Sequence, residues 1–96
     1  MYLVHIALHR PDGGGGLPAD ALASLWAAVS PGDHVEHISV HPHRAPHPVV
    51  GVYLLTDSLE AAEAGAERFC RRALTGSPDL ADWQVLSVGV PLVGPF

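Results

Sequence analysis

Histidine is the residue type through which this sequence can most readily do chemistry, and its seven copies are unevenly spaced. Three of them, His41, His43 and His47, lie in the eight-residue segment HPHRAPHP, together with Arg44 and three prolines. Imidazole groups exchange protons near neutral pH and also ligate zinc or copper. The segment therefore has three interpretations: a metal-chelating loop, part of a catalytic or binding site, or a proline-stiffened connection between two strands.

The metal interpretation has one favourable feature, because His41 and His43 are separated by a single residue and can chelate from an extended chain. Against it, the segment holds no cysteine or carboxylate at a diagnostic spacing, and Cys70 is the only cysteine of the chain. His5 and His9 would lie about 13 Å apart on a strand and could not share one ion. We predict no metal and no cofactor at the site, and keep a histidine-based metal-binding protein as an alternative.

Charge and composition exclude several classes of function. The 96 residues are 48% hydrophobic and carry a net charge of −5, with five arginines and no lysine. An acidic chain does not suit the nucleic-acid backbone, and the lack of lysine excludes Schiff-base and P-loop lysine chemistry. No apolar run approaches the roughly 20 residues of a membrane span, and the N-terminal MYLVHIALHR favours a strand over a signal peptide. We expect a cytoplasmic protein with neither a nucleic-acid nor a membrane partner.

Hydrophobic periodicity predicts the elements that must position these side chains. Strands are predicted over residues 2–9, 34–41, 49–56 and 83–93. One helix is predicted up to about residue 30, and another from a capping box of Asp57 and Glu60 up to the TGSPDLAD segment. The helix stripes expected in the core are Leu22, Leu25, Trp26 and Val29, and Leu59, Ala62, Ala66, Phe69, Cys70 and Ala73.

The order β-α-β-β-α-β predicts a single α+β domain over residues 1–96. Right-handed crossovers favour the ferredoxin-like arrangement, a four-stranded antiparallel sheet in the order 4-1-3-2 with two helices on one face. The other face of the sheet is then left open.

Alternation along each strand decides which side chains lie on that open face. Those expected to face the helices are Tyr2, Val4, Ile6, Leu8, Ile38, Val40, Val50, Val52, Leu54, Leu86, Val88 and Val90. Those expected on the open face are Leu3, His5, Ala7, His9, Val35, His37, Ser39, His41, Val49, Gly51, Tyr53, Leu55, Trp83, Val85, Ser87 and Gly89. A register error of one residue would move a strand's whole set to the other face.

The open face expected from this pattern suits a small organic ligand. Four histidines lie on it with the aromatic groups Tyr53 and Trp83, and the small residues Ala7, Gly51 and Gly89 leave a hollow. Because Tyr and Trp also favour interfaces, and because so small a domain gains from association, we expect a homodimer.

General acid–base catalysis is the chemistry that this face can perform without a cofactor. The candidate catalytic residues are His5, His37 and Tyr53, because the strand of Tyr53 lies between the strands of the two histidines. The expected ligand-binding residues are His9, Ser39, His41, Trp83, Ser87 and Arg44. No carboxylate is expected on this face to orient an imidazole, so the sequence leaves open whether the protein is an enzyme.

In element order and in the composition of its open face, the chain resembles the dimeric α/β-barrel group of ferredoxin-like proteins. The resemblance covers nearly the whole chain and is one of topology. It implies two sheets paired face to face, a pocket in each protomer and, in many members, cofactor-independent monooxygenase, cyclase or ligand-binding activity. The chain is shorter than that pattern and lacks the long connections that help close the barrel. Acylphosphatases and metallochaperones share the topology, but the asparagine and the cysteine pair that they need are absent here.

The sequence is compatible with three functions, since topology alone does not assign one. The first is a small-molecule-binding protein or a cofactor-independent enzyme, resembling a cyclase, isomerase or monooxygenase, that uses the open face. The second is a non-catalytic interaction or regulatory subunit whose sheet face is an oligomer interface. The third is the histidine-based metal-binding protein.

Overall fold

The computed structural model of the chain describes residues 1–13 and 15–90. Its strands are β1 (Tyr2–His9), β2 (Val35–His41), β3 (Val49–Leu54) and β4 (Gln84–Gly89), and its helices are α1 (Ala21–Ala27) and α2 (Leu59–Gly76). Two short 3-10 turns, Pro31–Asp33 and Pro78–Leu80, precede β2 and β4. The predicted element order is confirmed, and residues 91–93 of the last predicted strand lie outside the described residues.

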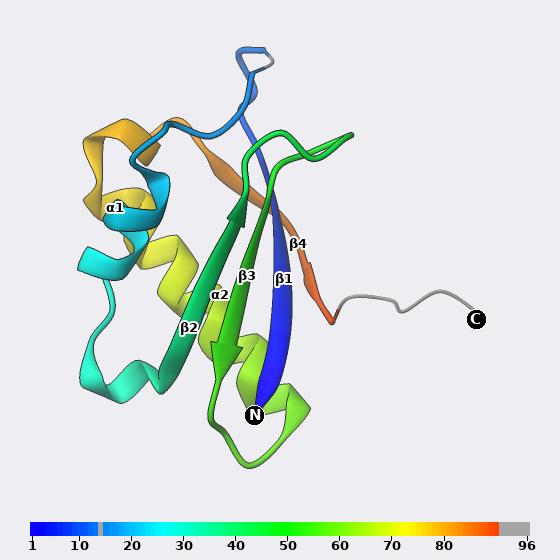
Figure 1. Cartoon of the computed structure of the whole chain (residues 1–96), viewed down its shortest axis with the longest axis vertical. Coiled ribbons are helices and arrows are strands. Elements are labelled where there is room, and N and C mark those ends of the chain that lie inside the picture. The colour runs from blue at the N-terminus through cyan, green and yellow to red at the C-terminus, as the bar shows by residue number, and fades with distance from the viewer. Residues whose placement is uncertain (14, 91–96) are drawn as a thin grey trace.

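The four strands form one antiparallel sheet in the order β2-β3-β1-β4, which confirms the predicted topology. In the view of Figure 1, α2 passes behind the strands and α1 lies to the left of β2. α2 packs against β1 and β4, and α1 packs against β2. The first layer is therefore the sheet and the second is the helix pair. We call the side of the sheet away from the helices the open face.

The core lies between these two layers and is apolar throughout. Alternate residues of the central strands are fully buried: Val4, Ile6 and Leu8 of β1, and Val50, Val52 and Leu54 of β3. The buried stripe of α2 packs against them, and it consists of Ala62, Ala66, Phe69, Cys70, Ala73 and Leu74. Burial raises the pKa of the Cys70 thiol to about 12, so this cysteine is a protonated core residue, as its position in the stripe predicts.

The two helices depart from the predicted boundaries in instructive ways. The N-cap of α2 is Ser58, whose Oγ accepts a hydrogen bond from Ala61 N, so the predicted box at Asp57 is displaced by one residue. The first helix is only two turns long, and its buried residues are Ala21 and Leu25. The helix therefore turns Leu22 and Trp26 outward, and the prediction of these two as core residues is wrong: they are 42% and 40% exposed.

A β-bulge in β4 changes the facing of that edge strand. Ala7 pairs with Ser87, but the next residue of β1, Leu8, pairs with Val85, which leaves Leu86 as the extra residue. Beyond the bulge the alternation is shifted by one, so Val85 packs on the core and Leu86 is 47% exposed. The predicted facing of these two residues is wrong for this reason.

The same shift removes Trp83 from the open face. Its side chain is only 5% exposed and belongs to the core cluster, with the Arg10 guanidinium 5.5 Å from the centre of its ring. A second irregularity, in β2, pairs Val35 with Leu54 and His37 with Tyr53, leaving Glu36 extra. Val35 therefore packs on the core instead of lying on the open face, where alternation placed it.

Candidate functional site

The strand register arranges the remaining open-face residues in rows across the sheet. The rows, each read from β2 towards β4, are His37–Tyr53–Leu3, Ser39–Gly51–His5–Gly89 and His41–Val49–Ala7–Ser87, with His9 paired to Gln84 beyond them. Four of the predicted histidines are thus on one face. The rows also show that small residues gather towards β4, while larger side chains gather towards β2.

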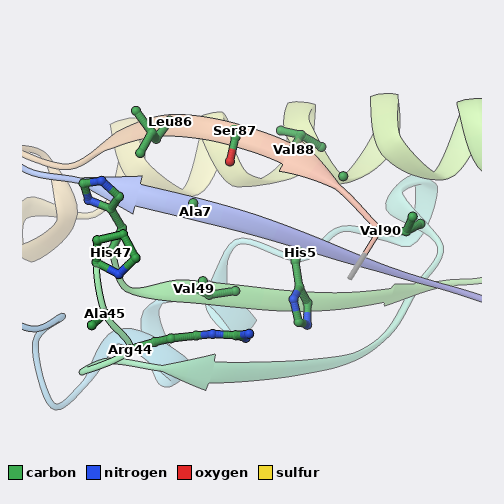
Figure 2. Close-up of a pocket in the computed structure, with 12 residues that line it drawn as sticks. His5, Ala7, Arg44, Ala45, His47, Val49, Leu86, Ser87, Val88 and Val90 are labelled. Carbon is green, nitrogen blue, oxygen red and sulfur yellow. The ribbon is translucent and has the colours of Figure 1, made fainter. Parts of the chain in front are cut away.

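A hollow of about 520 Å³ lies on the open face where those small residues gather. Figure 2 shows its floor on β1, β3 and β4, and its rim on the loop that joins β2 to β3. The lining residues are His5, Ala7, Arg44, Ala45, Pro46, His47, Val49, Leu86, Ser87, Val88, Gly89 and Val90. The volume is that of a typical small-molecule site.

The predicted small residues contribute unequally to this hollow. Ala7 and Gly89 line it, as expected, but Gly51 does not. A Cβ at Gly51 would lie 2.5 Å from Ser39 Oγ and 3.5 Å from the His5 ring, so neighbouring side chains already occupy the space that this glycine leaves. Gly51 therefore allows the side chains of Ser39 and His5 to approach each other across β3.

The loop that forms the rim, residues 42–48, is held by its backbone at both ends. Pro48 accepts a hydrogen bond from Leu8 N at 2.9 Å, and Pro42 accepts one from Leu17 N at 3.3 Å. Next to that second bond, Gly16 packs so closely that a Cβ there would lie 2.6 Å from the Pro42 carbonyl oxygen. Gly16 and Leu17 thus brace the loop that carries Arg44. This loop lies at the same end of the sheet as the end of β1 (Figure 1).

His5 lies in the floor of the hollow, and its surroundings disfavour the charged form. Burial lowers the pKa of His5 below its ordinary value of 6.5, and the charges of Arg44 and His41 lower it further. The His5 and His41 ring centres are 6.0 Å apart, and Ser39 Oγ lies 3.4 Å from His41 Nε2. The lowered pKa therefore favours the neutral imidazole of His5, which has a nitrogen able to accept a proton.

A second pair of imidazoles stands at the loop end of the hollow. The rings of His9 and His47 meet edge to face, with their centres 6.3 Å apart. His47 lines the hollow, whereas His9, a predicted ligand-binding residue, is one step removed from it. Thus the HPHRAPHP segment ends β2 with His41 and contributes four consecutive residues, 44–47, to the lining of the hollow.

The predicted catalytic trio is divided by the structure. His37 and Tyr53 lie side by side, with ring centres 5.6 Å apart, as their pairing across β2 and β3 requires. Neither is among the residues that line the hollow, which contains His5 alone of the three. The structure therefore offers two separate places on the open face, the hollow and the His37–Tyr53 pair.

The predicted ligand-binding residues are divided in the same way. Arg44 and Ser87 line the hollow, while Ser39 and His41 lie beside it against His5. Seven lining residues were not predicted as part of a site: Ala45, Pro46, His47, Val49, Leu86, Val88 and Val90. Alternation does place Val49 on the open face, but nothing in the sequence marks the bulge that turns Leu86 outward or the fold of the loop that brings in His47.

Two further features of the described residues concern other kinds of function. Within residues 1–13 and 15–90, no group of three or more histidine, cysteine, aspartate or glutamate side chains is placed to hold a metal ion. In the same part of the chain, no helix has the length and apolar character needed to cross a membrane. Comparisons of the sequence with protein-family models, with curated proteins and with solved structures gave no match.

Proposed function

We propose that the protein binds a small organic molecule in the hollow of its open face. The observation that carries this proposal is the combination of size and chemistry in one place. The hollow has about 520 Å³, apolar walls, and a few polar groups, His5, Arg44, His47 and Ser87, that converge on it. A concave, largely apolar site with few oriented polar groups is the common form of a small-molecule site.

The bracing of the rim supports the same proposal. Hydrogen bonds at Pro42 and Pro48 fix the two ends of the loop that carries Arg44 and His47. A rim that is already ordered loses less conformational entropy when a ligand binds. The hollow is therefore suited to bind without first rebuilding its loop.

A second candidate function is cofactor-independent proton transfer on the bound molecule. The observation that favours it is the lowered pKa of His5. A lowered pKa favours the neutral form of the imidazole, which is the form that can accept a proton. In this proposal His5 is the general base. His37 and Tyr53, the other predicted catalytic residues, act only if the substrate extends beyond the hollow towards β2.

Chemical-shift mapping tests the binding proposal directly. A set of small organic fragments, each added to the ¹⁵N-labelled chain, is expected to shift the amides of Ala7, Ser87 and Gly89 and the imidazole resonances of His5. The amides of α2 serve as the internal control and are expected to stay in place. Fragments that shift only resonances outside the hollow, or that shift none, would contradict the proposal.

The predicted homodimer is tested separately, by measuring the molar mass of the protein with light scattering as it elutes from a size-exclusion column. We propose that two copies paired through their open faces leave the hollow between the two sheets accessible to the ligand. A dimer whose interface protects Ala7, Ser87 and Gly89 from every fragment would favour the alternative of a non-catalytic subunit.

A further inference from the structure

The charge of the hollow is opposite to the charge of the chain. The sequence has ten acidic residues against five arginines, a net charge of −5. The described lining of the hollow nevertheless includes the guanidinium of Arg44, together with the imidazoles of His5 and His47, and none of those ten carboxylates. A cleft lined by one sign of charge concentrates ions of the other sign, even on a molecule whose net charge repels them.

Arg44 is the centre of this positive region. Figure 2 shows its side chain reaching from the loop along the direction of β2 and β3, with the guanidinium end directed towards His5. The proximity of this charge is one of the causes that lower the pKa of His5. Arg71 and Arg72 are paired with Glu67 and Asp33, but within the described residues no carboxylate forms an ion pair with Arg44.

The side of the hollow along β4 has a different chemistry. Leu86 and Val90 are 47% and 42% exposed, and they line the hollow together with Ala7 and Val49. Exposed aliphatic side chains around a cavity are typical of a surface that is covered when a ligand binds. The hollow therefore has a cationic side on the loop and an apolar side on β4.

We propose that the molecule bound in the hollow is a small organic anion, whose carboxylate or phosphate group contacts Arg44 and His5 and whose apolar part covers Leu86 and Ala7. This inference rests on the proposed function and names the ligand class of the same site. The planar guanidinium donates two parallel hydrogen bonds to a carboxylate or phosphate, and a nearby imidazole N–H adds a third. The bound anion in turn supplies the negative charge that the site lacks.

The proposal has a consequence for His5 that a purely apolar ligand would not produce. A bound anion favours the protonated imidazole, so binding raises the pKa of His5, and by linkage the anion binds more tightly as the pH falls. The titratable or charged groups that act on His5 are Arg44 on the loop and His41 on β2, while His47, at the loop end of the hollow, contacts His9. The neighbours of His5 on β3 and β4, Gly51 and Gly89, do not titrate.

The experiment compares three probes of similar size at low ionic strength: 3-phenylpropanoate, 2-phenylethyl phosphate and the neutral 3-phenylpropanamide. Each is titrated into the full chain while the resonances of His5, Ala7 and Ser87 are followed. At least one of the two anions is expected to bind about tenfold more tightly than the amide. Which of them is tighter distinguishes a carboxylate ligand from a phosphate ligand. The tighter anion is also expected to raise the pKa of His5.

Variants at arginine positions separate the local charge from the net charge. Arg44→Gln is expected to remove most of the preference for the anions, and Arg44→Lys to keep part of it, because lysine retains the charge without the planar fork. Arg68→Gln is the matched control, since Arg68 is exposed on α2 and does not line the hollow. It lowers the net charge equally and is expected to leave the preference unchanged. Thermal melting confirms that each variant is folded.

The possible failures are distinguishable. If the amide binds in the hollow as tightly as both anions, or if Arg44→Gln and Arg68→Gln have the same effect, the inference of an anionic ligand is overturned while binding in the hollow stands. If neither these probes nor the wider fragment set shifts Ala7, Ser87 or His5, the proposed function is overturned with it.

Discussion

His5 and His37 lie on the same face of the same sheet, separated by β3, yet their surroundings differ. His5 is partly buried in the floor of the hollow, near Arg44 and His41, and its pKa is lowered. His37 is exposed on β2, and its described ring neighbour is Tyr53. The comparison shows that a histidine on the open face of the sheet is not by itself sufficient to make a site. The small residues on β1 and β4 and the loop over them make the difference.

Filling the hollow is the strongest way to break this comparison. Ala7→Phe places an aromatic ring in the floor of the hollow, and we expect it to weaken binding of the tighter anion by about tenfold or more, because the ligand loses its space. Calorimetric titration measures the effect. Leu3→Phe is the control, since Leu3 lies on the same strand and face but in the row of Tyr53. Equal affinities in the two variants would place the site elsewhere.

Loosening the rim is expected to have the next largest effect. Gly16→Ala brings a Cβ to 2.6 Å from the backbone oxygen of Pro42, so the loop that carries Arg44 must move. Such overpacking costs about 1 to 3 kcal/mol of unfolding free energy, and the displaced Arg44 weakens anion binding. Urea denaturation and the same titration measure both effects.

The control for this variant is Gly32→Ala, because a Cβ at Gly32 meets no atom within 4 Å. We expect its unfolding free energy to stay within about 0.5 kcal/mol of the original chain. If Gly16→Ala binds the anion as tightly as Gly32→Ala, the bracing of the loop has no role in the site.

Replacing His5 or His37 compares the contributions of the two histidines to anion binding directly. His5→Ala is expected to weaken anion binding by about threefold to tenfold, since it removes one hydrogen-bonding group of the site. His37→Ala is expected to leave the affinity unchanged. The reverse result would move the site to the His37–Tyr53 pair, where the sequence also placed a candidate.

The smallest effect is a shift in titration. By NMR, the pKa of His5 is expected below 6.5 in the free protein, with burial as the largest cause and Arg44 as the second. Arg44→Gln is therefore expected to raise that pKa without returning it to 6.5. Because the unfolded chain binds this proton more readily, the stability linked to His5 is fully present above pH 6.5 and is lost as the pH falls through the folded-state value. A pKa at or above 6.5 in the free protein would contradict this description of the hollow.

The helix-covered half of the molecule could be predicted from the sequence because its signals are repetitive. Val4, Ile6 and Leu8 alternate along β1, and the stripe of α2 recurs at helical spacing, so each residue supports the assignment of its neighbours. The order of the elements and the handedness of crossovers then determine the sheet order.

The open face could be predicted only where the alternation is unbroken. It holds on β1 and β3, so His5, Ala7 and Tyr53 are placed correctly, and it fails on β4 and at the start of β2. A bulge is a backbone irregularity that depends on how two strands fit together, and neither Leu86 nor Glu36 carries a local signal of it. The sequence marks His5, Arg44 and Ser87 of the hollow, but it does not show that the loop brings His47 to them. Arg44 and His47 reach the hollow through a loop whose path depends on its contacts with Leu8 and Leu17.

The central claim is that the hollow, and not the His37–Tyr53 pair, is the place where the protein binds its ligand. A crystal structure of the chain with the tighter of the two anionic probes tests it most directly. We expect the carboxylate or phosphate group to lie against Arg44 and His5, with the apolar part of the probe over Ala7 and Leu86. Ordered ligand against His37 and Tyr53, with the hollow occupied by solvent alone, would contradict it.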